Sequence, residues 1–160
     1  MPLSPLGIVH TLLGIGALLA VAVLLWQDKQ IRLERPLARF YLLATILTAA
    51  SALGIFRHGG ANAAHGLAVL TILAVGAGVV ATRVSFLGRL QKYAVALCFS
   101  ATVLFHLLPT ATEILTRFPV GSPLAGSLHD PLLQQTFGAI GLVFLIMLAL
   151  QLNWLRAHEG

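Results

Sequence analysis

The strongest constraint on this chain is an apolar stretch without a single charge, from Leu6 to Trp26. A bilayer core about 30 Å thick is crossed by a helix of roughly 17–25 mostly apolar residues, so this stretch is long enough to span it. Four further apolar segments follow, at 40–56, 63–81, 93–108 and 137–155. They are too long for strands and show no sustained alternation of apolar and polar residues. The sequence predicts an all-α, polytopic integral membrane protein, with five transmembrane helices packed as a four- or five-helix bundle in one domain over residues 1–160.

The composition supports this class. Hydrophobic residues make up 58% of the chain and charged residues 9%, whereas a soluble domain has about 45–50% and about 25%. An ordinary soluble domain and a disordered tail are therefore excluded, and the single cysteine, Cys98, excludes a disulfide scaffold. No Lys or Arg precedes the first segment, and no small-residue cleavage site follows it, so we expect a permanent helix rather than a signal peptide.

Several residues have the character of helix ends. Ser4 before Pro5, Asn62, and Asp130 before Pro131 are suited to begin helices. Pro109 is expected to stop the fourth segment, because proline disfavours a helical residue before it. That segment is then marginal in length, and a re-entrant segment is the alternative to a full span.

Lys and Arg are unequally shared between the two faces that five spans define. One face holds the N-terminus and the loops at 57–62 and 109–136, with only Arg57 and Arg117. The other face carries eight basic residues: Lys29, Arg32, Arg35, Arg39, Arg83, Arg89, Lys92 and Arg156. Short basic loops stay in the cytoplasm and meet anionic lipid favourably. This predicts a bacterial-type inner membrane protein with the N-terminus outside and the C-terminus in the cytoplasm, and it explains the net charge of +5 without nucleic acid.

Histidines follow the opposite pattern. Only His158 falls on the basic face, and the other five fall on the outer face: His10, His58, His65, His106 and His129. Three of these lie in expected spans, each within about one turn, roughly 5 Å, of the outer boundary. If the three helices are neighbours, His10, His65 and His106 converge on a shallow site. Three residues of the long loop are second candidates for ligands at that site: Glu113, His129 and Asp130.

Two kinds of cofactor suit such a site. Imidazole is a good ligand for a transition metal such as Zn, Cu or Fe. Two histidines on facing helices can instead ligate haem b, and Gly7, Gly14 and Ala17 share the helix face of His10. Haem would imply electron transfer with quinone or a periplasmic redox partner, and a bare metal would imply Lewis-acid chemistry or metal handling. The leading hypothesis is therefore an outward-facing histidine site for haem b or a transition metal.

Other classes of function stay open. The chain is also compatible with a non-enzymatic accessory or assembly subunit, in a homo-oligomer or a larger complex, and with a small-molecule or lipid carrier. No Asp, Glu, Lys or Arg lies in the middle of a span, which argues against an ion-coupled carrier. Glu113 and Arg117 have the spacing of a local ion pair. Eight neutral polar residues of the spans suit hydrogen bonds between helices: Thr45, Thr48, Ser51, Thr71, Ser100, Thr102, Gln151 and Asn153.

Overall fold

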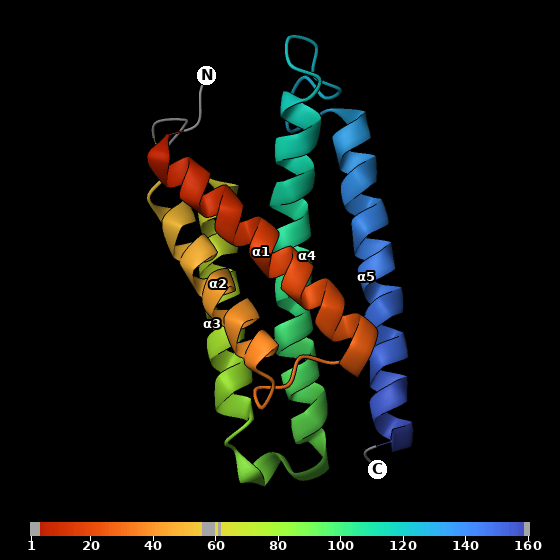
Figure 1. Ribbon diagram of the computed structural model, residues 1–160. Helices are drawn as coiled ribbons and strands as arrows, with labels where there is room; N and C mark the ends of the chain where they lie inside the picture. The colour runs from red at the N-terminus through yellow and green to blue at the C-terminus, as the bar shows by residue number, and fades with distance from the viewer. Residues whose placement is uncertain (1–3, 56–59, 61, 159–160) are drawn as a thin grey trace.

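The computed structural model describes residues 4–55, 60 and 62–158, and these residues form helices joined by short loops (Figure 1). Helices long and apolar enough to cross a membrane include all five expected spans. The elements are, in chain order, α1 (Pro5–Asp28), α2 (Pro36–Leu53), α3 (Ala63–Ala81), the short 3-10 helix η1 (Ser85–Leu90), α4 (Gln91–Arg117) and α5 (Pro131–His158). The all-α, five-helix prediction is confirmed, and the protein is a multi-pass membrane protein.

The expected helix starts are confirmed by their hydrogen bonds. The Ser4 hydroxyl accepts a bond from the Gly7 amide at 3.1 Å, and the Asn62 side chain accepts one from the Ala64 amide at 2.9 Å. The Asp130 carboxylate accepts bonds from the amides of Leu132 and Gly126, both at 3.0 Å. Each cap satisfies backbone donors that a helix start leaves without an internal partner.

The expected stop at Pro109 is wrong, because α4 continues through this proline to Arg117. Pro109 has no N–H, so it removes the backbone bond to the Phe105 carbonyl, a loss that membrane helices tolerate. In the following turn the Thr110 hydroxyl donates to the His106 carbonyl at 2.7 Å, and the Thr112 hydroxyl donates to the Leu108 carbonyl at 3.0 Å. The fourth span is therefore a long helix, which with η1 forms a candidate span from Ser85 to Arg117.

The second span also differs from its expected bounds of 40–56. It begins at Pro36 and ends at Leu53, with Gly54 as its C-cap. Proline at the first helical position is pre-organised for a helix, since its missing N–H would have no internal partner there. The helix therefore begins one turn earlier than the apolar pattern alone indicates.

The helices pack in sequence around α4. Neighbouring helices contact one another in the order α1–α2–α3–α4–α5, and α4 also contacts α1. In Figure 1, α1 crosses obliquely in front of α4, whereas α5 stands beside α4 at the edge of the bundle. The main core cluster lies between α1, α2 and α4, with Leu24, Tyr41 and Phe99 fully buried. At Gly78 of α3, a Cβ atom would overlap the Phe99 ring, so glycine allows α3 and α4 to approach closely.

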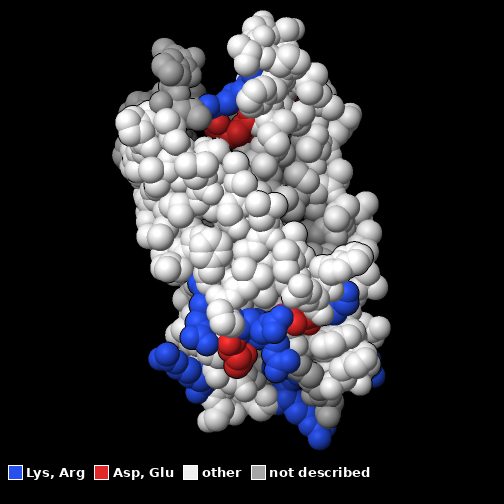
Figure 2. All heavy atoms as spheres, in the orientation of Figure 1, with Lys and Arg blue, Asp and Glu red and all other residues white. Residues whose placement is uncertain are grey.

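Charge divides the molecule as the sequence predicts. Figure 2 shows a broad belt without charged side chains, with most Lys and Arg gathered at the end of the bundle that holds the C-terminus. At the opposite end the same view shows one small group of charges in a hollow. We call these the basic end and the outer end. An uncharged belt between two polar ends is what a bilayer requires of a spanning protein.

Candidate functional site

The most polar part of the membrane-embedded core is a chain of hydroxyls and imidazoles along one face of α2. Tyr41, Thr45, Thr48 and Ser51 are spaced four, three and three residues apart, which places them on one side of a helix. Tyr41 and Thr45 are fully buried, and Thr48 is 6% exposed. Side chains of α1 and α4 meet this face. We call the whole set the histidine–hydroxyl seam, which consists of His10, Tyr41, Thr45, Thr48, Ser51, Thr102 and His106.

His10 lies at the outer end of this seam, in the second turn of α1. Its Nδ1 is 3.0 Å from the Thr48 carbonyl oxygen and 3.0 Å from the Ser51 hydroxyl. A carbonyl only accepts hydrogen bonds, so Nδ1 carries the proton and donates it. The ring is half-buried, so it lies nearer to the surface of the bundle than His106, which is 7% exposed.

His106 lies deeper than the sequence predicts. Because α4 runs on to Arg117, His106 sits eleven residues before the end of the helix, about 16 Å along its axis, and not in its last turn. It is 7% exposed, and its Nε2 is 3.0 Å from the Thr45 hydroxyl. The bundle therefore holds an ionisable imidazole in its interior, although the sequence has no Asp, Glu, Lys or Arg in the middle of a span.

Two hydroxyl contacts extend the seam around His106. The Thr102 hydroxyl donates to the Phe99 carbonyl at 2.6 Å, so Tyr41 must donate its own proton to Thr102, from which it is 2.5 Å away. The Tyr41 ring centroid is 6.3 Å from that of His106. Between the two histidines, the buried Thr48 hydroxyl has no hydrogen-bond partner among the described residues. Most buried hydroxyls have a partner, so this one is an exception within the seam.

The expected meeting of His10, His65 and His106 in one metal site is not found. Among the described residues, no group of three or more His, Cys, Asp or Glu is placed to hold a metal ion. His65 is buried in the first turn of α3, where its Nδ1 accepts a bond from the Asn62 amide at 3.3 Å and so completes a capping box. The structure thus brings His10 and His106 onto one seam and gives His65 a role in beginning α3.

The second candidates for ligands are engaged elsewhere. The Glu113 carboxylate forms an ion pair with Arg117 one helical turn later, as their spacing predicts. Asp130 caps α5, and His129 is exposed in the preceding loop. His58 and Arg57 lie outside the described residues. The ligand roles of Glu113, His129 and Asp130 remain predictions.

A second polar cluster lies toward the basic end and contains no ionisable group. The Ser100 hydroxyl of α4 donates to the Gln151 side-chain oxygen at 2.7 Å. The Gln151 amide then donates to the Lys29 carbonyl at the end of α1, at 2.8 Å. We call these three groups the Gln151 cluster. It joins α1, α4 and α5, and Gln151 is one of few buried residues of α5.

The sequence indicated the polar members of both groups but not their pairing. Of the eight residues expected to bond between helices, Thr45, Ser51, Ser100, Thr102 and Gln151 do so. Thr71 bonds to its own helix, and Asn153 is exposed. Tyr41 was missed, although it precedes Thr45 and Thr48 at helical spacing, and this is the signal that would have found it.

Comparison of the chain with models of protein families, with curated proteins and with solved structures found no match. The function is therefore inferred from the seam and its surroundings.

Proposed function

We propose that this membrane protein transfers protons from its outer face to His106 in the interior of the bundle, through the histidine–hydroxyl seam. The observation that carries the proposal is the pair of interhelical bonds by which α2 holds both imidazoles, His10 through Thr48 and Ser51, and His106 through Thr45. Ionisable groups inside a membrane bundle are costly, and chains of them are typical of proton relays.

Each group of the seam is chemically suited to this task. An imidazole accepts a proton at one ring nitrogen and releases one from the other, so it can pass a proton without remaining charged. A hydroxyl both accepts and donates, and a rotation resets it. His10 is half-buried and can exchange with water, whereas His106 and Thr45 are buried. The Thr48 hydroxyl lies between the contacts of the two rings on α2 and has no fixed partner among the described residues.

The test of the proposal is the rate at which the His106 ring proton exchanges with water. NMR on histidine-labelled protein in nanodiscs measures this rate. We expect exchange in the wild type and a rate at least about tenfold lower in His10→Phe, because the outer entry is removed. His158→Phe is the control, since His158 is exposed at the basic end. Equal rates in His10→Phe and the wild type would contradict the relay.

A second candidate is the site for haem b or a transition metal that the histidine pattern predicts. One observation favours it for His10, whose Nδ1–H donates to a backbone carbonyl. Metal-ligating histidines use this bond to orient the other ring nitrogen toward the metal. His106 would be the second ligand, and quinone or a periplasmic redox protein would be the partner for haem.

This candidate has a spectroscopic test. The protein is purified in detergent without chelators after expression with supplied haem, and its absorption spectrum and bound metals are measured. A Soret band that His106→Ala removes would support haem, and stoichiometric Zn, Cu or Fe without that band would support a metal. A colourless, metal-free protein would contradict both.

The direction of the relay depends on the orientation of the chain. We propose a bacterial-type inner membrane with the N-terminus outside, because the basic end carries eight of the ten Lys and Arg residues. A topology reporter fused after Gly160 should then report the cytoplasm. A periplasmic signal would reverse both faces and make the relay begin on the cytoplasmic side.

A further inference from the structure

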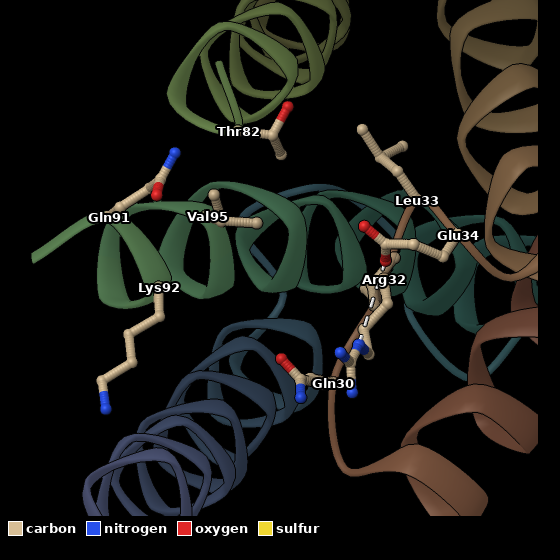
Figure 3. Close-up of a pocket in the computed structure, with 9 residues that line it drawn as sticks. Gln30, Arg32, Leu33, Glu34, Thr82, Gln91, Lys92 and Val95 are labelled. Carbon is tan, nitrogen blue, oxygen red and sulfur yellow. Dashed lines mark ion pairs between the residues drawn. The ribbon is translucent and has the colours of Figure 1, made fainter. Parts of the chain in front are cut away.

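A pocket of about 200 Å³ opens at the basic end, where the α1–α2 connection meets the end of α3 and the start of α4. The α1–α2 connection supplies one wall, the end of α3 supplies Thr82, and the start of α4 supplies Gln91, Lys92 and Val95 (Figure 3). This position is the boundary between the uncharged belt and the basic loops, because α3 ends at Ala81 and α4 begins at Gln91.

The lining of the pocket has two chemical characters. Apolar side chains come from Ile31, Leu33 and Val95, whereas Arg32 and Lys92 bring positive charge. Gln30, Thr82 and Gln91 add polar groups without charge. An amphiphile that enters from the membrane edge meets apolar groups and cationic groups at the same place. A phospholipid headgroup with its glycerol has this combination, and basic pockets between spans on the cytoplasmic side are typical binding places for such headgroups.

Charge favours an anionic ligand. The basic end carries eight Lys and Arg against Asp28 and Glu34 among the described acidic residues. Glu34 itself lines the pocket and lies 3.9 Å from Arg32. A guanidinium has five N–H donors in a planar fork, so Arg32 can contact this carboxylate and a phosphate together. Its side chain is 53% exposed and thus accessible from the membrane surface.

Lys92 contributes to the attraction of an anionic ligand mainly through the electrostatic field of its charge. Its amine donates to the Leu155 carbonyl in the last turn of α5 at 2.9 Å, and Figure 3 shows it turned away from Thr82 and Val95. This bond fixes the charge at the rim of the pocket and ties α5 to the start of α4.

From this placement we infer that the pocket binds the phosphate-bearing headgroup of an anionic phospholipid, with Arg32 as its principal contact. The inference is independent of the relay, because none of the lining residues belongs to the histidine–hydroxyl seam. Free phosphate shares the charge but not the apolar part, so the apolar wall at Ile31, Leu33 and Val95 favours the lipid.

The test counts lipid molecules retained by the full chain in native mass spectrometry, from nanodiscs of phosphatidylglycerol mixed with phosphatidylcholine. We expect one strongly retained phosphatidylglycerol. Its affinity should fall about fivefold in Arg32→Gln, the effect of one cation near a membrane surface. Arg89→Gln is the matched control, since it removes a positive charge from η1 at the same end but outside the pocket. Circular dichroism confirms the helical fold of each variant.

A second variant tests the pocket without changing charge. Val95→Phe fills the lining and should also lose the retained lipid. Equal retention of phosphatidylcholine, equal weakening by Arg89→Gln, or unchanged retention in both pocket variants would overturn the inference. Competition by inorganic phosphate at the concentration of the lipid would also overturn it, in favour of a site for free phosphate.

Discussion

The histidine–hydroxyl seam and the Gln151 cluster are both polar contacts inside a membrane bundle, but they differ in what they can change. The seam contains two imidazoles, whereas the Gln151 cluster contains a hydroxyl, an amide and a carbonyl, which neither gain nor lose protons near neutral pH. The cluster also joins the peripheral α5 to α1 and α4, and the seam lies within the core formed by α1, α2 and α4. We therefore propose that the cluster contributes to stability and that the seam serves proton transfer.

The largest loss of stability is expected from Gly78→Ala, which touches neither polar region. Its Cβ would overlap the fully buried Phe99 ring, and overpacking of this kind costs about 1–3 kcal/mol. The free energy of unfolding in mixed micelles measures the cost, with Gly76→Ala as the control because the space beside Gly76 is open. We expect the His106 ring-proton exchange to keep its rate. If exchange accelerates with the loss of stability, it proceeds by local opening of the bundle and not along the seam.

The next effect is expected from Thr45→Val, which keeps the shape of the side chain and removes the hydroxyl bonded to His106. A buried imidazole left without this partner costs about 1–2 kcal/mol, and the ring-proton exchange should slow several-fold. Thr71→Val is the matched control, since Thr71 is equally buried but bonds to its own helix. Equal effects of the two variants on the exchange rate would show that the Thr45 hydroxyl has no specific role in proton transfer to His106.

A smaller effect on stability separates the two regions most clearly. Gln151→Leu removes both hydrogen bonds of the Gln151 cluster, and interhelical bonds in membranes are worth about 0.6 kcal/mol each on average. We expect a loss of about 1 kcal/mol in the free energy of unfolding and an unchanged exchange rate at His106. A slower exchange would mean that the cluster takes part in proton transfer, and the distinction would fail.

The smallest effect is expected from Tyr41→Phe. It removes the bond from Tyr41 to Thr102, but the Thr102 hydroxyl keeps its bond to the Phe99 carbonyl. One lost interhelical bond predicts a cost of about 0.6 kcal/mol in the unfolding free energy. Tyr41 lies beyond His106 as seen from His10, so exchange at His106 should be nearly unchanged. A large slowing would place the proton entry on the side of Tyr41.

The sequence predicted the spans well because their signal is local. Apolar runs show the helices, and Ser4, Asn62 and Asp130 show where three of them begin. The expected end at Pro109 failed because a membrane helix can pass through a proline, which removes only one backbone bond. The expected end placed His106 in a last turn, whereas it lies eleven residues before the end of α4.

The site was less predictable than the fold for a physical reason. Residue type and spacing place Thr45 and Thr48 on one side of α2, but they do not say which helix that side faces. The pairing of Thr45 with His106, and of Ser51 with His10, depends on helix neighbours and rotations that are set by packing across the whole bundle. His65 is a different case, because its capping bond to Asn62 is local and still was not expected.

One measurement tests the central claim most directly, the exchange rate of the His106 ring proton in His10→Phe compared with Gln151→Leu. Each variant replaces one polar side chain of one region with an apolar one. The account predicts a rate at least about tenfold lower in His10→Phe and a wild-type rate in Gln151→Leu. Equal rates in the two variants, or a slower rate only in Gln151→Leu, would contradict a relay that begins at His10.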